Sequence, residues 1–347
     1  MTVPPTPGVA RRYAVVLLQF GAGVALVAVL GVVVWWLIPA PKVPPGWQLF
    51  RPPRDTLVLA RVGNEVWAGG PDGLFAMNLD GSGVAHPIAV DQKLEHVTSI
   101  SAAAGDVWVG HAAGASRWDG VAWHAYSEQD GLPDKQVWAV RKTSDGTIWV
   151  GTERGLAQRV GDEWHTWTAR DGLAADAVTV IFEDSVRRLW VGNGLTFAGG
   201  LSVIETGKAR VIARDKLPHI MVNAITEDAR GGIWVGTGFG SRGGACRLKG
   251  EEVRTLGKSD GLAGEKVRSL LVDHASGVWF GAEYDGAARL TRGSWTYVTK
   301  SDGLAGNEVK SMIEDDDGNL WFGTENGVSR CQRAVCGAQS SVLKDGE

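Results

Sequence analysis

Seven tryptophans recur along this 347-residue chain at nearly equal intervals, and each is followed two residues later by glycine. Successive members of the series lie between 41 and 45 residues apart. An interval of about 40 to 45 residues is typical of one four-stranded blade of a β-propeller. The seven tryptophans are Trp67, Trp108, Trp149, Trp190, Trp234, Trp279 and Trp321. The series therefore predicts an all-β fold, a seven-bladed β-propeller of four-stranded antiparallel blades.

Two further markers keep a fixed distance from the tryptophan in five of the repeats. An aspartate, usually within Asp-Gly-Leu, lies 19 residues before it, and a valine lies 12 residues before it. The aspartates are Asp130, Asp171, Asp215, Asp260 and Asp302, and the valines are Val137, Val178, Val222, Val267 and Val309. Alternating apolar residues from each valine predict the innermost strand of a blade, and the tryptophan lies on the second. Aspartate and glycine favour turns, so Asp-Gly-Leu is expected to build the loops between blades.

The tryptophan and its glycine have different predicted tasks in the blade. A tryptophan ring buries roughly 150–250 Å² and can fill the wedge between two adjacent sheets. Glycine lacks a Cβ atom, so we expect it where neighbouring backbone comes close.

Paired aromatic residues mark the predicted fourth strand, as in Trp123 with Tyr126 and Trp164 with Trp167. Residues 47–50 have the same character but precede the first blade. We therefore expect them to form the outer strand of the last blade, so that the propeller spans residues 47–336 and closes across its two ends. A closed ring leaves no edge strand open to aggregation.

Residues 13–38 contain no charged side chain. At about 1.5 Å per residue such a helix exceeds the roughly 30 Å of a bilayer core, so the segment predicts a single transmembrane α-helix before the propeller. Arg11 and Arg12 place residues 1–12 in the cytoplasm by the positive-inside rule. The alternative is a cleaved signal peptide, which has an apolar region of about 7–15 residues and a small-residue cleavage site. Residues 39–46 form a proline-rich linker, and residues 337–347 a polar tail.

Composition excludes several classes of protein. The net charge is −4, with 35 basic and 39 acidic residues, so the chain has no electrostatic footprint for nucleic acid. Asp315, Asp316 and Asp317 resemble part of a calcium loop, but the alternating ligands and the distal glutamate are missing. No Cys-x-x-Cys-His haem motif is present. We expect no metal and no cofactor.

Three cysteines remain to be explained. Cys331 and Cys336 flank the predicted terminal turn of the last blade, where paired strands would bring them within bonding distance in an oxidising exterior. We expect a disulfide between them. Cys246, on a predicted third strand, is expected to be a small buried apolar residue.

The repeat resembles a known family. Asp-Gly-Leu, followed by Val-x-x-Ile-x-Glu-Asp and Gly-x-(Ile/Leu)-Trp-Val-Gly-Thr-x-x-Gly-Leu, is similar to the two-component regulator propeller repeat, most closely over residues 130–156 and 302–328. In that family the repeats typically form the extracytoplasmic sensor of hybrid two-component proteins, and they are similar to modules that bind carbohydrates. The resemblance implies a sensory module at the bacterial cytoplasmic (inner) membrane, with a periplasmic or extracellular propeller.

Candidate binding residues lie in loops that gather on one face of a propeller, around the channel mouth. These loops join the second strand to the third within a blade and the fourth strand to the next blade. The informative residues are those that break the repeat, because the repeating ones serve turn geometry. The predicted ligand-binding residues are His111, Glu153, Arg154, Phe197, His219, Phe239, Arg242, Glu283, Tyr284, Glu325 and Asn326. Their mixture of charges and aromatic rings suits a carbohydrate, a peptide or another polar small ligand.

Three classes of function remain open. The first is a ligand-binding or sensory module that signals through a separate membrane partner. The second is a scaffold for other envelope proteins, which predicts a broad exposed apolar patch. The third is a propeller enzyme similar to streptogramin lyases or lactonases, for which His111 and His219 are the rim histidines. We assign no catalytic residue, because the sequence supplies no second base or ligand at a defined spacing.

Overall fold

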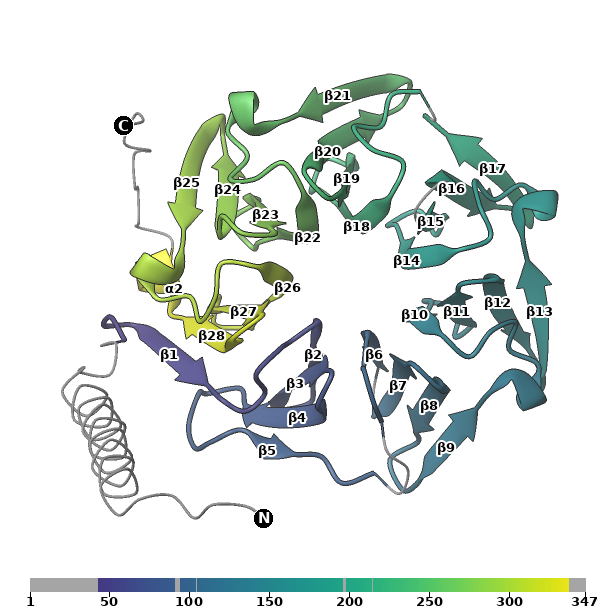
Figure 1. Cartoon of the computed structure of the whole chain (residues 1–347), viewed down its shortest axis with the longest axis horizontal. Coiled ribbons are helices and arrows are strands. Elements are labelled where there is room, and N and C mark those ends of the chain that lie inside the picture. Colours follow the sequence, from purple (N-terminus) through teal and green to yellow (C-terminus); the bar gives the residue numbers. More distant parts are fainter. Residues whose placement is uncertain (1–42, 91–93, 104, 196–197, 214, 337–347) are drawn as a thin grey trace, which may run out of the picture. The chain divides into compact units, whose positions relative to one another are not determined.

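The computed structural model describes residues 43–90, 94–103, 105–195, 198–213 and 215–336. Seven four-stranded antiparallel sheets form a ring in which strand order follows the chain in six blades (Figure 1). The predicted propeller is confirmed. The predicted transmembrane helix at 13–38, with segments 1–12 and 337–347, lies outside the described residues. Within the described part of the chain, no helix combines the length and apolar character needed to cross a membrane.

Each blade begins at the channel and ends at the outer surface of the ring (Figure 1). Blade 1 is β2 (Val58–Val62), β3 (Glu65–Gly70), β4 (Gly73–Asn78) and β5 (His86–Pro87); blade 2 is β6 (Ser99–Ala103), β7 (Asp106–His111), β8 (Gly114–Trp118) and β9 (Trp123–Tyr126); blade 3 is β10 (Val137–Lys142), β11 (Ile148–Thr152), β12 (Gly155–Val160) and β13 (Glu163–Trp167); blade 4 is β14 (Val178–Glu183), β15 (Leu189–Gly194), β16 (Gly199–Glu205) and β17 (Lys208–Ile212).

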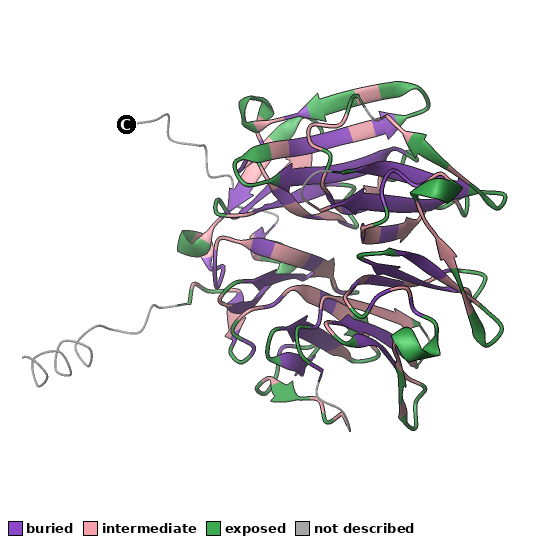
Figure 2. Ribbon diagram, turned by 45° about the vertical axis from the view of Figure 1, so that its right-hand side comes forward, coloured by how far each residue is buried: buried purple, intermediate pink, exposed green. Residues whose placement is uncertain are grey.

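The remaining three blades follow the same plan. Blade 5 is β18 (Val222–Glu227), β19 (Ile233–Phe239), β20 (Arg242–Lys249) and β21 (Glu252–Leu256); blade 6 is β22 (Val267–Val272), β23 (Val278–Ala282), β24 (Ala287–Thr291) and β25 (Ser294–Val298); blade 7 is β26 (Val309–Glu314), β27 (Leu320–Thr324), β28 (Gly327–Cys331) and β1 (Trp47–Phe50). We name the four strands of every blade A to D from the channel outwards. Burial is concentrated in the strands, and the exposed residues lie mainly in turns and outer strands (Figure 2).

The marker tryptophans fill the seams between blades, as predicted. Trp108, only 1% exposed, packs against Val137, Val140 and Ile148 of the following blade. The marker glycine meets neighbouring backbone, as expected at Gly281, where a Cβ atom would lie 2.5 Å from the carbonyl oxygen of Val309, and it also meets a valine side chain. A Cβ atom built on Gly110 would lie 2.6 Å from Cγ1 of Val137, the marker valine of the next blade. Gly151 faces Val178 and Gly236 faces Val267 in the same way. The marker glycine of one blade and the marker valine of the next blade therefore contact each other at the seam between the two blades.

The Glu-Asp pair of the repeat is also structural. Asp184 accepts hydrogen bonds from Nε1 of Trp190 at 2.8 Å and from the backbone N–H of Arg188 at 2.8 Å, which fixes the A–B turn of its own blade. Glu183 accepts from the backbone N–H and the hydroxyl of Ser144, each at 2.7 Å, and so ties blade 4 to the A–B turn of blade 3.

Asp-Gly-Leu builds one loop geometry between blades. Asp130 accepts from the backbone N–H of Ser127 at 2.8 Å and from its hydroxyl at 2.9 Å, and Gly131 adopts a positive φ of 101° that favours glycine. Leu132 then enters the core at 3% exposure. Four 3₁₀ turns of the described chain share the bond from a backbone N–H to the aspartate three residues later: η1 (Glu128–Asp130), η2 (Ala169–Asp171), η3 (Lys258–Asp260) and η4 (Lys300–Asp302).

The ring closes as predicted, with β1 as the outer strand of blade 7. Trp47 pairs with Cys331, and Phe50 pairs with Val328. The ring of Phe50 stacks on that of Trp321, with centroids 5.4 Å apart.

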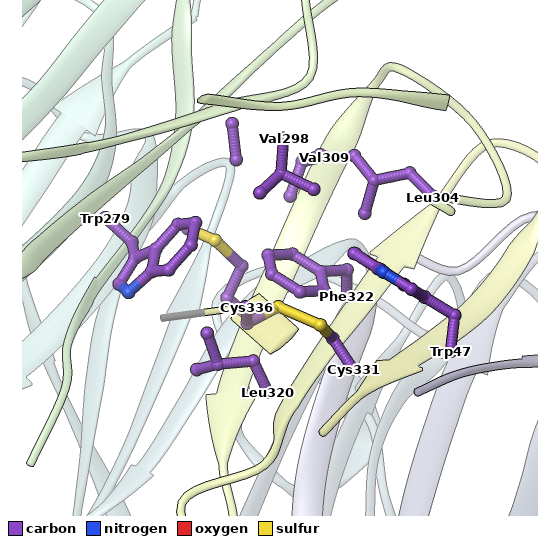
Figure 3. Packing of buried hydrophobic residues seen from close by; sticks show 11 residues of the cluster. Trp47, Trp279, Val298, Leu304, Val309, Leu320, Phe322, Cys331 and Cys336 are labelled. Carbon is purple, nitrogen blue, oxygen red and sulfur yellow. A yellow bond between two sulfur atoms is a disulfide. The ribbon is translucent and has the colours of Figure 1, made fainter. Parts of the chain in front are cut away.

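A short helix, α2 (Arg333–Cys336), follows β28. Cys331 and Cys336 form a disulfide whose Cα atoms are 5.9 Å apart, and both side chains lie in the core of blade 7 beside Phe322 and Leu320 (Figure 3). Cys246 is a buried free cysteine, in agreement with its predicted role.

Candidate functional site

The loops of blades 5 and 6 enclose a cavity of about 490 Å³. It lies on the face that carries the B–C and D–A loops, where the sequence places the candidate residues. Its walls are the B–C turn of blade 5, the D–A loop between the two blades and the B–C turn of blade 6. The lining residues are Phe239, Gly240, Ser241, Lys258, Gly264, Glu265, Lys266, Glu283, Tyr284 and Asp285. Its volume falls within the range of about 300–1,000 Å³ that small-ligand sites occupy.

Two aromatic rings on this rim are exposed to solvent. Phe239 is 51% exposed and Tyr284 is 72% exposed. They are the two aromatic side chains among the large hydrophobic residues that are exposed in the described chain, and both line this one cavity. Exposed aromatic side chains that converge on a cavity are typical of binding sites, since a bound ligand buries their apolar surface.

Charged side chains beneath the aromatic rings are paired with one another. Lys266 donates to Glu283 at 2.7 Å, and both side chains are largely buried. Lys258 lies 3.9 Å from Asp285 nearer the surface. Two ion pairs therefore line the cavity together with the aromatic rings and provide hydrogen-bonding groups for a ligand.

The ion pairs continue from this cavity along the channel wall. Arg268 contacts Glu283 at 3.5 Å and Glu308 at 3.2 Å. Lys310 forms ion pairs with Glu308 at 3.3 Å and with Asp55 at 2.7 Å. The series of ion pairs therefore extends through blade 7 to the segment before blade 1.

Blades 2, 4 and 5 have neutral residues at the position of Arg268 and Lys310. Thr98, Thr179 and Asn223 donate instead to the carbonyl groups of Val137, Val222 and Val267. Sequence reasoning missed this position, which directly follows the marker valine. The signal was present in the repeat, because charge at that position is confined to blades 6 and 7.

His219 lies in the D–A loop that precedes blade 5. Its Nδ1 accepts a hydrogen bond from the backbone N–H of Met221 at 3.0 Å. Burial lowers the pKa of His219, and the positive charges of Arg242 and Lys266 lower it further. The neutral form of the ring is therefore favoured at pH 7, and because Nδ1 accepts a hydrogen bond, the proton lies on Nε2.

His111 lies apart from this cavity, within blade 2. It is 4% exposed; its Nε2 pairs with the hydroxyl of Ser116 at 2.9 Å, and its Nδ1 accepts from the N–H of Ala113 at 3.2 Å. Burial lowers the pKa of His111 to about 4. Both ring nitrogens are occupied inside the blade, so the predicted rim histidine is a buried packing residue.

The other predicted residues divide between the cavity and distant blades. Phe239, Glu283 and Tyr284 line the cavity, and His219 and Arg242 belong to the adjoining blade 5 loops. Glu153 and Arg154 lie on blade 3, where Arg154 pairs with Asp134 at 3.2 Å. Glu325 and Asn326 lie on blade 7, and Phe197 falls outside the described residues.

Glu325 and Asn326 serve the loops of blade 7. Glu325 accepts from the backbone N–H groups of Asn307 and Glu308, at 3.1 and 3.0 Å, and Asn326 donates to the carbonyl of Ala305 at 3.1 Å. These contacts explain both residues without a ligand. In the described parts of the chain, no group of three or more His, Cys, Asp or Glu side chains could hold a metal ion.

The family model described as two component regulator propeller matches residues 131–154, 216–239 and 303–326, which are the repeats of blades 3, 5 and 7. No curated protein sequence is significantly similar to this chain. Among solved structures, the extracellular domain assigned to the hybrid two component system BT3049 from B. thetaiotaomicron has a TM-score of 0.68 at 15% identity. That match covers 84% of this chain and 42% of the other, so this chain spans less than half of that domain.

Two smaller proteins share the fold over nearly their whole length. Virginiamycin B lyase from Staphylococcus aureus has a TM-score of 0.63 at 15% identity, over 84% of this chain and 99% of the lyase. YCF48, solved bound to D1 peptide, has a TM-score of 0.62 at 11% identity, over 84% of this chain and 99% of its own. A sensor domain, an enzyme and a peptide-binding protein thus share one architecture. The similarity establishes the propeller fold, and the site must decide the function.

Proposed function

We propose that this propeller is a ligand-binding, sensory module, and that its ligand occupies the cavity between the loops of blades 5 and 6. The observation that carries the proposal is the convergence of Phe239 and Tyr284, both exposed, on one cavity that is also lined by ion-paired charged side chains. The matches to a two component regulator propeller family and to the extracellular domain of such a system support a sensory task.

The proposed ligand is a polar molecule with an apolar or planar face, such as a carbohydrate or a short peptide. Aromatic rings pack against such faces, while Lys266 and Glu283 offer a donor and an acceptor below them.

The setting of the module is part of the proposal. Residues 13–38 would anchor the chain in the bacterial inner membrane, with the propeller on the periplasmic or extracellular side. In this proposal a separate membrane partner receives the signal.

A thermal-shift screen of the full-length protein against oligosaccharides and short peptides tests this proposal. A ligand that binds the folded state at 100 times its Kd stabilises the protein by about 2.7 kcal/mol, which is measurable as a rise in Tm. We expect Tyr284→Ala and Phe239→Ala each to weaken the identified ligand by at least about tenfold, because each removes an aromatic wall.

Val186→Ala is the matched control, because Val186 is an exposed apolar residue in an A–B turn on the opposite face. It should leave ligand affinity unchanged. The proposal fails if no ligand raises Tm, or if a ligand binds Phe239→Ala and Tyr284→Ala as tightly as it binds the wild type.

A further inference from the structure

A second cavity, of about 400 Å³, lies between blades 2 and 3 on the opposite face of the ring. It is bounded by the A–B and C–D turns of blade 3 and by strands of blade 2. The lining residues are Asp106, Trp108, Arg117, Lys142, Asp145, Gly146, Thr147, Ile148, Arg159 and Gly161. Three of these residues are cationic and two are anionic, so the lining carries net positive charge.

Blades 5 and 6 show how a tryptophan and an arginine of this kind are normally satisfied. In blade 5, Oδ2 of Asp228 accepts from Nε1 of Trp234 at 2.9 Å and from Nε of Arg247 at 2.6 Å. Asp273 bridges the tryptophan and the arginine of blade 6 in the same way, at 2.8 and 2.6 Å. One carboxylate therefore serves both donors.

Blade 2 keeps the two donors in the same arrangement. Trp108 on β7 is the cross-strand partner of Arg117 on β8, whose guanidinium lies 5.9 Å from the centroid of the tryptophan ring. Ala102 stands six residues before this tryptophan, where blades 4 to 7 have aspartate. The buried Nε1 of Trp108 has no hydrogen-bond partner among the described residues.

A second donor in this cavity is also without an acceptor. Arg159 donates through Nε to the carbonyl of Gly161 at 3.1 Å and through Nη2 to the carboxylate of Asp162 at 3.3 Å, and its guanidinium lies 4.8 Å from the Tyr126 ring centroid. Its Nη1 is buried and unpaired within the described structure. A buried donor left without a partner costs about 1–3 kcal/mol, so two in one cavity favour an acceptor from outside the chain.

The two carboxylates that line the cavity, Asp106 and Asp145, already accept hydrogen bonds from other groups. Asp106 accepts from Arg117 at 2.7 Å and from Lys142 at 2.5 Å, and although burial opposes it, these bonds lower the pKa of Asp106. Oδ1 of Asp145 accepts from the Thr143 hydroxyl and the Thr147 N–H. Neither carboxylate therefore accepts a hydrogen bond from Nε1 of Trp108 or from Nη1 of Arg159.

We propose that the cavity between blades 2 and 3 binds the carboxylate group of a small organic acid. The carboxylate takes the place that Asp228 and Asp273 occupy in their own blades, beside the tryptophan–arginine pair, and it pairs with Arg159. The volume admits a molecule the size of a sugar acid or of one amino-acid residue. This site is independent of the aromatic rim between blades 5 and 6.

Titration of the full-length protein with D-glucuronate, followed through the indole N–H resonances of its tryptophans, tests the proposal. D-glucose is the matched probe, because it has the same ring without the carboxylate. We expect a saturable shift of the Trp108 resonance with glucuronate and none with glucose; Trp108→Phe assigns the signal. N-acetylalanine, compared with its amide, then distinguishes a peptide carboxylate from a sugar acid as the source.

Two variants test the geometry. Arg159→Gln removes the charged donor and should weaken glucuronate binding by at least about tenfold. Asp106→Glu lengthens the side chain by one carbon. Glu65 has the corresponding position in blade 1, two residues before the tryptophan, and it accepts from Nε1 of Trp67 at 2.9 Å. Asp106→Glu should satisfy Trp108 internally, weaken the ligand by a similar factor and leave Tm unchanged or raised.

Lys208→Gln, which removes an exposed cation after the C–D turn of blade 4, is the control and should bind glucuronate as the wild type does. The proposal is overturned by equal responses to glucuronate and glucose, by no response to either carboxylate, or by unchanged affinity in Arg159→Gln and Asp106→Glu.

Discussion

The seams between blades and the rim of blades 5 and 6 are built from the same repeat, but their side chains are used differently. In the seams, recurring members of the repeat contact the neighbouring blade: Gly151 faces Val178, and Glu183 binds the turn of the previous blade. On the rim, Phe239 and Tyr284 stand in solvent over a cavity.

This difference separates the residues that hold the ring from those that are available to a ligand. Residues that recur at the fixed spacing, such as Gly151, Val178 and Glu183, make contacts between blades, and substitution there should lower stability. Phe239 in blade 5 and Tyr284 in blade 6 are not part of the recurring pattern and are exposed, so substitution there should weaken ligand binding.

The largest effect is expected at the closing strand. Phe50→Ala removes a buried ring that stacks on Trp321 and should lower the free energy of unfolding by about 3–5 kcal/mol, as measured by chemical denaturation. Phe50→Leu retains most of the apolar volume and should lose much less. A loss below about 1 kcal/mol for Phe50→Ala would show that β1 contributes little to closure.

Acid should act on the buried histidine of blade 2. Burial lowers the pKa of His111 from its ordinary value of 6.5 to about 4 in the folded chain, so the unfolded chain binds the proton first as pH falls. Stability from His111 is complete above pH 6.5 and is lost as pH falls from about 6.5 to about 4, by about 3 kcal/mol in total.

His111→Asn should remove this part of the pH dependence. Blade 4 has Asn193 at the corresponding position, where its side-chain oxygen accepts from Ser202 at 3.0 Å. Unfolding free energies of the wild type and the variant at pH 7 and pH 4.5 measure the difference. Equal pH dependence in the two proteins would contradict the assignment.

A smaller effect is expected at the seam glycine. Gly151→Ala puts a Cβ atom 2.6 Å from Cγ1 of Val178 and should cost about 1–3 kcal/mol through overpacking. Val178→Ala in the same chain should restore part of that loss, and a double-mutant cycle measures the coupling. Additive losses would mean that the two markers do not form one contact.

The smallest effect on stability is expected at the rim. Tyr284→Ala should change the free energy of unfolding by no more than about 0.5 kcal/mol, because the side chain is 72% exposed. A larger loss would place Tyr284 with the seam residues and remove the contrast between the two regions.

The fold was predictable because the aspartate, the valine and the tryptophan recur at fixed spacing, which restricts the chain to repeats of one structural unit. The tryptophan series defined the blades, and residues 47–50 could be matched to an outer strand by their aromatic pattern. The partner of the marker glycine was not predictable from a single blade, because its neighbour is the valine of the next one.

The candidate site was predictable only in part. Loop assignment placed Phe239, Glu283 and Tyr284 on the correct face, and the structure brings them to one cavity. It could not show that His111 turns inward to Ser116, since a hydroxyl on the neighbouring strand decides that orientation. Nor could it show the ion pairs of Arg268, whose partners come from two different loops.

Strand β1 has a consequence for the order in which the protein is made. The ribosome synthesises β1 first among the strands and its partner β28 last. Until β28 emerges, the backbone groups of β1 have no ladder partner and the apolar side of Phe50 has no cover. Blade 7 is therefore the last to be completed, and during elongation the growing chain is a row of blades with an open gap. Until then the open strand edge exposes the growing chain to pairing with a neighbouring molecule.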